Sequence, residues 1–347
     1  MFKKNMMVIF FVLFMAGVSG AAASIIIDGA GATFPSPLYY RWIEKYQKAT
    51  GVRITYQKVG SGSGIKAVLD REVDFGGTDV FLSDEEMVKT DHGIIHIPTC
   101  IGAVAIIYNL PGCPDLRFTP ELLADIFLGR IRSWSHEEIR KINKDLTPSN
   151  MRITVVHRTD GSGTNYLFTD YLSKVSPRWS KVIGTGKKVI WSTGIGVEKN
   201  SGVAETVKNI PGSIGYVSLT YAQENHIPVA MIKNRCGNFI APDARTLSSA
   251  AMVNLPTDMR VLFTDTDVSD GYPIGAFTYL IFYREQAYNN RSREKAVSLA
   301  RFLWWCVHEG QLDTTELFYA PLPEDAVWKT EQIIRSMTYN GEKIVTW

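Results

Sequence analysis

The sequence predicts an α/β protein in which mainly parallel sheets are flanked by helices. Short apolar strands alternate with amphipathic helices, and glycine-rich turns separate them, which is the pattern of β-α-β units. The length of 347 residues indicates two domains. Two similar proline-marked strand entries, at 97–108 and 272–283, lie far apart in the chain. They predict two crossovers between lobes, with the second lobe inserted into the first.

The first residues have the pattern of a secretory signal peptide. Two lysines precede an apolar stretch over residues 6–18, and the alanines at 21–23 offer a cleavage site before Ser24. A membrane anchor is the alternative, but the apolar stretch is short for a transmembrane helix. Because no cysteine follows the alanines directly, lipid attachment is not expected. Residues 1–23 are therefore predicted to be a cleaved signal peptide of an exported protein.

The remaining elements of the first lobe follow from apolar periodicity and from glycine, proline and capping residues. The expected strands and helices are, in order, a strand at 25–28, a helix at 39–49 ended by Gly51, a strand at 52–56, a helix at 65–70, a strand at 73–79 and a helix that begins at Ser83. After the second lobe, a strand at 276–283 and a long helix at 294–308 are expected to complete this lobe.

The second lobe shows the same alternation. Its expected elements are a strand at 101–108, helices at 120–128 and 135–142, a helix that opens at 202–204 and ends before Pro211-Gly212, and a strand at 214–217. The predicted boundaries are residues 24–99 plus 275–347 for the first lobe and 100–274 for the inserted second lobe.

Charge and cysteine content narrow the class of protein. The chain has 37 Lys and Arg and 35 Asp and Glu residues, and two of the lysines leave with the signal peptide. The neutral remainder argues against a nucleic-acid partner. No Cys-x-x-Cys pair and no histidines at metal-ligand spacing occur, so no metal or other cofactor is expected. Of the four cysteines, Cys100 and Cys113 are the first candidates for a disulfide, and the pairing stays open.

The run from Arg158 to Thr164 is the most informative stretch. It follows a β-branched segment at 153–156 and opens an amphipathic segment at 165–172, which predicts a strand, a glycine-rich turn and a helix start. A helix start offers unpaired N–H groups and a partial positive charge, and arginine adds a charged fork of donors. The run therefore predicts a site for a small tetrahedral oxyanion. Helix capping without any ligand is the alternative.

Two further glycine or hydroxyl turns, at 32–34 and 60–64, also lie between a predicted strand and a predicted helix. In parallel sheets such turns meet at the carboxyl edge, where ligands bind. Three of them favour one convergent site over three unrelated helix caps.

Four motifs together resemble the periplasmic phosphate-binding protein of bacterial phosphate ABC transporters, and the resemblance covers nearly the whole chain after the signal peptide. The motifs are 29–35, 73–83, 158–164 and 210–217. The resemblance implies a two-lobed periplasmic-binding-protein fold, type II-like, with a two-strand hinge that closes over one phosphate. Carried over by motif, the phosphate-binding residues would be Thr33, Phe34 through its backbone, Ser61, Asp79, Arg158, Asp160, Ser162, Gly163 and Thr164.

The resemblance also implies a protein that binds inorganic phosphate in the periplasm and delivers it to the permease subunits of the importer, without catalysis. We expect a monomer, although the sequence does not determine the oligomeric state. Phosphate near neutral pH carries a proton and sulfate carries none. An ionised, buried Asp79 would accept a hydrogen bond from the phosphate O–H and would disfavour sulfate. Arg158 would supply the positive charge, and Asp160 would hold its guanidinium.

Three alternatives stay open at this point. One is a receptor for another tetrahedral oxyanion on the same fold, against which Asp79 argues. A second is a secreted phosphatase or serine hydrolase with Ser162 as nucleophile, although no His-Asp partner pattern accompanies that serine. A third is an added role of an outer face in surface attachment.

Overall fold

The computed structural model describes residues 25–90, 93–113, 115–146 and 150–345. The predicted signal peptide, residues 1–23, lies outside the described residues. Among those described, no helix is both long enough and apolar enough to cross a membrane.

The elements come in three stretches of chain. The first stretch contains β1 (Ile26–Gly31), α1 (Ser36–Thr50), β2 (Arg53–Lys58), α2 (Ser61–Leu69), β3 (Phe75–Thr78), α3 (Asp84–Val88) and β4 (Ile94–Tyr108). The second contains β5 (Arg117–Phe118), α4 (Pro120–Phe127), α5 (Glu137–Ile142), β6 (Thr154–Arg158), α6 (Gly163–Val175), α7 (Pro177–Val182), β7 (Ile195–Val197), α8 (Lys199–Asn209), β8 (Ser213–Ser218), α9 (Leu219–Glu224), β9 (Met231–Lys233), β10 (Phe239–Ile240) and α10 (Ala244–Ala250). The last contains β11 (Gly275–Tyr283), α11 (Arg293–Val307), η1 (Glu309–Asp313), η2 (Thr315–Leu317), α12 (Glu324–Arg335), β12 (Thr338–Tyr339) and β13 (Glu342–Lys343).

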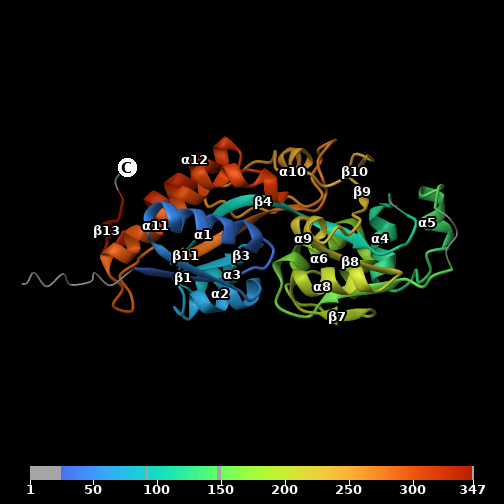
Figure 1. Cartoon of the computed structure of the whole chain (residues 1–347), viewed down its shortest axis with the longest axis horizontal. Coiled ribbons are helices and arrows are strands. Elements are labelled where there is room, and N and C mark those ends of the chain that lie inside the picture. Colours follow the sequence, from blue (N-terminus) through green and yellow to red (C-terminus); the bar gives the residue numbers. More distant parts are fainter. Residues whose placement is uncertain (1–24, 91–92, 114, 147–149, 346–347) are drawn as a thin grey trace, which may run out of the picture.

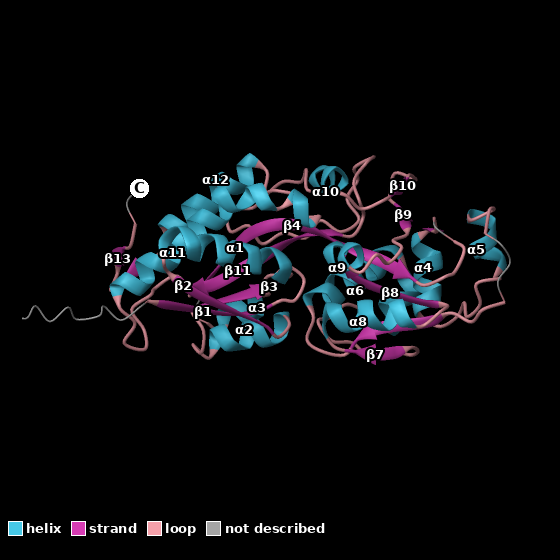
Figure 2. Ribbon diagram, in the orientation of Figure 1, coloured by secondary structure: helices cyan, strands magenta, loops and turns pink. Residues whose placement is uncertain are grey.

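Two lobes lie side by side, and β4 runs from one into the other (Figure 1). The described strands of the main sheet follow the order β2-β1-β3-β11-β4-β8-β6-β7. The first lobe holds the strands from β2 to β11 and the beginning of β4. The second holds the end of β4 and the strands from β8 to β7. Helices flank both halves of the sheet (Figure 2), so the predicted two-lobed α/β fold is confirmed.

The outer strands of each lobe are parallel, as the β-α-β pattern predicts. β1 pairs in parallel with β2 and β3, and β6 pairs in parallel with β7 and β8. The middle differs, because β11 is antiparallel to β3 and β4, and β4 is antiparallel to β8. The strand β4 carries the chain out of the first lobe, and β11 carries it back, so the two strands run in opposite directions. A parallel pair would need a helix crossover that returns the chain to the same end of the sheet.

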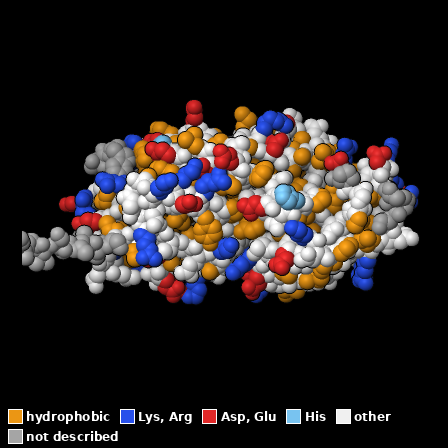
Figure 3. Space-filling model, viewed as in Figure 1, with side chains coloured by type: hydrophobic (Ala, Val, Ile, Leu, Met, Phe, Trp, Pro, Cys, Tyr) orange, Lys and Arg blue, Asp and Glu red, His pale blue; other side chains and the backbone are white. Residues whose placement is uncertain are grey.

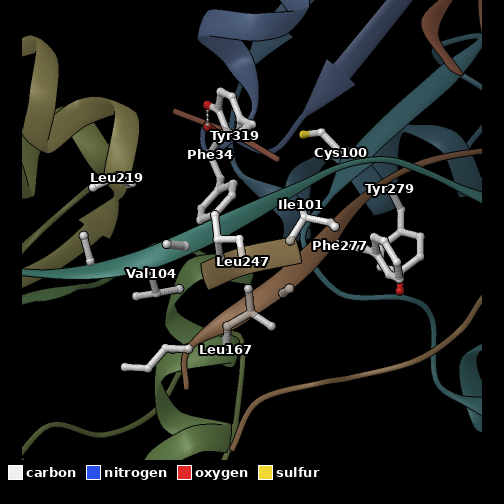
Figure 4. Close-up of a cluster of buried hydrophobic side chains, with 14 of the residues drawn as sticks. Phe34, Cys100, Ile101, Val104, Leu167, Leu219, Leu247, Phe277, Tyr279 and Tyr319 are labelled. Carbon is white, nitrogen blue, oxygen red and sulfur yellow. Dashed lines mark hydrogen bonds between the residues drawn. The ribbon is translucent and has the colours of Figure 1, made fainter. Parts of the chain in front are cut away.

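The strand β4 forms the core that the lobes share. All of its residues are buried. Figure 4 shows side chains from both lobes gathered around it, including Phe34 and Phe277 from the first lobe and Leu167 and Leu219 from the second. The pairing of β11 with β4 shifts register between Thr278 and Tyr279, which lie opposite Cys100 and Pro98. A proline in mid-strand fits at such a bulge. The lobe boundaries at 99/100 and 274/275 stay a prediction.

The predicted disulfide between Cys100 and Cys113 is not formed. The four cysteines are free thiols. Cys100 lies inside β4, which continues in extended form to Tyr108. At about 3.3 Å per residue, eight residues of strand span roughly 26 Å. The five residues that follow cannot return Cys113 to the 4.4–6.8 Å Cα separation, approximately, that a disulfide needs.

Several local predictions are confirmed by their caps. Gly51 ends α1 with φ 73° and donates its N–H to the carbonyl of Gln47. Ser83 begins α3 through a capping box with Glu86. The helix predicted at 65–70 starts earlier, at Ser61, because Gly60 makes the turn with φ 92°.

Candidate anion site between the lobes

The lobes touch where the predicted turns meet. The N–H of Gly62 donates to the carbonyl of Gly161 at 2.8 Å, and the N–H of Gly163 donates to Ser61 Oγ at 3.1 Å. A Cβ atom on Gly163 would lie 2.6 Å from both Asp79 Oδ2 and Ser61 Oγ. Only glycine fits at this approach. The N-terminus of α6 is therefore pressed against the ends of β3 and the start of α2.

Arg158 is the buried cation of the site. It ends β6, and its side chain is 1% exposed. Its Nε and Nη2 donate to the two carboxylate oxygens of Asp160 at 2.7 and 2.5 Å. Nη1 is buried and has no hydrogen-bond partner among the described residues. Asp160 therefore forms a bidentate pair with the guanidinium and leaves Nη1 free to donate to a ligand.

Asp160 stays a carboxylate in this position. Burial opposes its ionisation, but the hydrogen bonds and the charge of Arg158 outweigh burial and hold its pKa below the ordinary value. Its Oδ1 also accepts the backbone N–H of Lys199, the first residue of α8, at 3.3 Å. Asp160 therefore ties β6 to α8.

Asp79 is the buried acid opposite that cation. It follows β3 directly and is 2% exposed. Its Oδ1 accepts the hydroxyl of Thr278 on β11 at 3.0 Å, and its Oδ2 accepts that of Ser61 at 3.4 Å. Burial raises the pKa of Asp79 from 3.8 to about 7, against the lowering effects of Thr278 and of the charge of Arg158. Near neutral pH the carboxyl group can therefore exist with or without its proton.

Thr33 and Phe34 enter the site from the turn between β1 and α1. Thr33 Oγ1 accepts from the side-chain amide of Asn200 at 2.8 Å, and its carbonyl accepts from the hydroxyl of Tyr221 at 3.0 Å. The carbonyl of Phe34 accepts from Tyr319 at 2.7 Å, a bond drawn in Figure 4. The ring of Phe34 lies in the shared core, so the packing of that ring fixes the backbone of the turn.

Ser162 and Thr164 flank the start of α6. Ser162 caps the helix, because its Oγ accepts the N–H of Asn165 at 3.0 Å. Thr164 Oγ1 accepts from the amide of Asn200 at 3.3 Å. A hydroxyl that accepts one hydrogen bond still has its own proton to donate, so capping and anion binding use compatible geometry.

The nine residues predicted from motifs therefore belong to one place in the structure. Gly163 of the second lobe contacts Ser61 and Asp79 of the first. Thr33 of the first lobe and Thr164 of the second share the side-chain amide of Asn200. Their individual roles toward a ligand stay predictions.

Sequence reasoning missed four polar partners of these residues. Asn200 lies on α8, Thr278 on β11, Tyr221 on α9, and Tyr216 on β8, where its hydroxyl accepts the N–H of Arg158 at 3.0 Å. Thr278 had one signal, because it is a polar residue inside an otherwise apolar strand. Tyr216 lies inside the 210–217 motif, but that motif does not show its contact with Arg158. Asn200 and Tyr221 have no local signal, since their function depends on which turn they face.

Two α/β lobes meet here at a helix start, next to a strand that ends in a buried arginine. This is the architecture of a ligand-binding protein of the periplasmic class. The family model described as "PBP superfamily domain" matches residues 17–309. The chain is 36% identical over 316 residues to phosphate-binding protein PstS of Pasteurella multocida, covering 88% of this chain and 90% of that protein. It is 38% identical over 315 residues to PstS of Xylella fastidiosa, covering 89% and 84%. The chain belongs to the PstS family of this superfamily.

The fold agrees with that assignment. The solved phosphate-binding protein from Stenotrophomonas maltophilia superposes with a TM-score of 0.70 at 19% sequence identity, covering 88% of this chain and 93% of that one. At this identity the likeness concerns the fold alone.

Proposed function

We propose that this protein binds one inorganic phosphate between its lobes and delivers it to the permease of an ABC-type phosphate importer. The names of its curated relatives support phosphate as the ligand. The observation that carries the proposal is the buried guanidinium of Arg158, whose Nη1 has no partner among the described residues. Arg158 ends β6, and the glycine turn that follows it leads to the start of α6, where the helix dipole and backbone N–H groups also favour an anion.

The donors of the site outnumber its acceptors. We assign phosphate contacts to Arg158, to the backbone at Phe34 and Gly163, and to the hydroxyls of Thr33, Ser61, Ser162 and Thr164. On binding, the N–H of Gly163 and the hydroxyl of Ser61 exchange their present partners, Ser61 Oγ and Asp79, for the anion. Asp79 is the acceptor for the proton of the phosphate, and Asp160 holds the arginine. The net charge of the chain is close to zero (Lys, Arg, Asp and Glu are interspersed over the face in Figure 3), so these local groups supply the attraction.

A proton shared between Asp79 and the anion would make the site prefer phosphate over sulfate. An ionised Asp79 accepts a hydrogen bond from the phosphate O–H. Sulfate brings no proton, so an ionised Asp79 would face a bare oxygen, at a cost of about 3–5 kcal/mol for an uncompensated buried charge. While Asp79 is ionised, that penalty corresponds to about two to four orders of magnitude in affinity. Sulfate avoids the penalty by binding the protonated form, so the difference between the two anions shrinks as the pH falls toward the Asp79 pKa of about 7. The same argument disfavours the other fully ionised oxyanions.

A titration of protein stripped of bound anion tests the proposal. Isothermal calorimetry at pH 9, where Asp79 is ionised, should show one phosphate per chain and sulfate binding weaker by about two orders of magnitude, since each pH unit above the Asp79 pKa of about 7 corresponds to about tenfold. Equal affinities for the two anions would contradict the role of Asp79, and no phosphate binding would contradict the proposal itself.

The proposal is of a binding protein without catalysis. A hydrolase that used Ser162 as nucleophile would need a base beside the hydroxyl. The neighbour found there is the backbone N–H of Asn165, which donates to Ser162 Oγ. Incubation with a chromogenic phosphate ester should release no product above a blank, whereas turnover lost in Ser162→Ala would favour the hydrolase.

The signal peptide and the oligomeric state can also be tested. We propose cleavage before Ser24, a periplasmic location and a monomer. Mass spectrometry of the exported protein should give Ser24 as its first residue, and size-exclusion chromatography with light scattering should give the mass of one chain.

The Gly163→Ala variant should bind phosphate about 100-fold more weakly or worse. The added Cβ would lie 2.6 Å from Asp79 Oδ2 and from Ser61 Oγ, so the lobes cannot approach as closely. The control is Gly202→Ala within α8, where the new Cβ would meet Val197 at an ordinary 3.5 Å. Calorimetry should show normal affinity for the control. Normal affinity for Gly163→Ala would mean that ligand binding does not need this close approach.

A further inference from the structure

Asn200 is a completely buried residue that contacts both lobes, and no motif predicts it. We propose that Asn200 is a latch that holds the lobes closed and orients two threonine hydroxyls toward the anion. It is a positioning residue that acts through those threonines. The orientation part of this inference rests on the proposed phosphate site, whereas the latch part concerns the protein without any ligand.

The side chain of Asn200 joins the two lobes directly. Its Nδ2 donates to Thr33 Oγ1 of the first lobe at 2.8 Å and to Thr164 Oγ1 of its own lobe at 3.3 Å. Its backbone N–H lies 3.4 Å from the same Thr33 oxygen. Opening of the lobes separates Asn200 from Thr33 and breaks the two bonds between them, whereas the bond to Thr164 stays within the second lobe. Water replaces the lost partners, so the bonds to Thr33 favour the closed arrangement by the modest net value of a protein hydrogen bond.

The orientation of the amide is set from its other end. Asn200 Oδ1 accepts the N–H of Ser218, at the end of β8, at 2.9 Å. A backbone N–H can only donate, so the oxygen must face Ser218 and the NH₂ group must face the threonines.

This polarity determines what the threonines can do. Each threonine oxygen already accepts a hydrogen bond from Asn200, so the proton of each hydroxyl is available to a third group. The hydroxyl of Thr164 has the carboxylate of Asp79 as one acceptor, since a hydrogen bond from Thr164 lowers the pKa of Asp79. A phosphate oxygen is an acceptor that both hydroxyls can serve. Asn200 therefore converts Thr33 and Thr164 into donors before the ligand arrives, which lowers the cost of ordering them on binding.

The backbone before Asn200 is strained in support of this position. Lys199 is not a glycine, yet it has φ 64°, in the left-handed region. Its N–H donates to Asp160 Oδ1, the oxygen that also accepts Arg158 Nε. The carboxylate that holds the arginine of the site thus also holds the start of α8. Strain of this kind persists where the surroundings enforce it, as at binding sites.

Two variants of Asn200 test its bonds to the threonines and to Ser218. Asn200→Ala removes every side-chain bond of the latch. Asn200→Asp keeps an oxygen for the N–H of Ser218 but has no hydrogen to donate to either threonine. The control is Asn234→Ala, because Asn234 is a buried asparagine whose amide donates to the carbonyls of Val268 and Gly271, away from the site.

The first measurement needs no phosphate. Small-angle X-ray scattering of stripped protein should give a larger radius of gyration for Asn200→Ala and Asn200→Asp than for the wild type, and an unchanged radius for Asn234→Ala. Equal radii for the wild type and both Asn200 variants would overturn the latch, whether or not the protein binds phosphate.

The second measurement follows phosphate by stopped flow. The rate of phosphate release should rise about 10- to 100-fold in both Asn200 variants, while the association rate changes less than about threefold, because the latch forms after encounter. The control should lose thermal stability without any change in release. Unchanged release in the Asn200 variants would overturn the orienting role. A wild type that fails to bind phosphate would instead overturn the proposed function, and the scattering result would still decide the latch.

Discussion

Phosphate affinity in Arg158→Ala is expected to fall by about two to four orders of magnitude. The variant removes the buried cation of the site and its uncommitted Nη1. It also leaves the carboxylate of Asp160 without the two charged hydrogen bonds that hold it, next to the incoming anion. Calorimetry on stripped protein measures the loss.

Two further variants show whether the loss concerns the site itself. Arg158→Lys keeps the charge without the bidentate fork, so its affinity should lie between those of the wild type and the alanine variant. Arg178→Ala removes a half-exposed arginine that pairs with Asp125 on the second lobe, and its affinity should be normal. If Arg158→Ala bound phosphate within a few-fold of the wild type, the arginine would not be the cation of the site.

The Asp79→Asn variant is expected to lose most of its preference for phosphate over sulfate. An amide presents no buried negative charge to sulfate and offers an N–H donor, so the ratio of the two affinities should fall to about tenfold or less, since the charge penalty disappears. The control is Asp74→Asn in the same lobe, where the buried carboxylate pairs with Arg291 and Lys295. Competition titrations with both anions should leave the ratio of this control unchanged. An unchanged ratio in Asp79→Asn would contradict the filter.

The pH dependence of sulfate binding follows from the same group. Burial raises the pKa of Asp79 to about 7. Below that pH the carboxyl group holds a proton that it can donate to sulfate. Sulfate affinity of the wild type should therefore rise as the pH falls from 8 to 6, and that of Asp79→Asn should not. A wild type with flat sulfate affinity over this range would contradict the assignment.

The stability of the ligand-free protein should change with pH in the matching direction. Because the pKa of Asp79 is higher in the folded protein than the usual 3.8, the folded state binds the proton more tightly than the unfolded chain. The stabilisation is complete below about pH 4 and is lost as the pH rises through about 7. Urea unfolding at pH 8 should show Asp79→Asn more stable than the wild type by a few kcal/mol, with the difference shrinking toward pH 4. A less stable variant at pH 8 would contradict this.

Much of the fold was predictable because its signals are local. Glycine turns, capping residues and alternating apolar segments specify single strands and helices, and most of the predicted elements occur within a few residues of their expected places. The antiparallel middle of the sheet was not predictable in the same way, because the pairing of β4 with β11 joins segments more than 170 residues apart. The predicted disulfide between Cys100 and Cys113 is wrong for a related reason. It was based on their closeness in sequence, whereas the extended strand β4 separates them in space.

The hydrogen-bond donors of the site follow from the local sequence. Glycines, hydroxyls and an arginine at a helix start are a local property of the run from Arg158 to Thr164, and they attract an anion wherever that run lies. The surroundings of those donors depend on how distant parts of the chain pack together. Burial of Asp79 raises its pKa, Thr278 and Asn200 reach the site from distant elements, and the close contact at Gly163 brings the lobes together. These depend on which surfaces lose water and face one another, and no single stretch of chain carries that information.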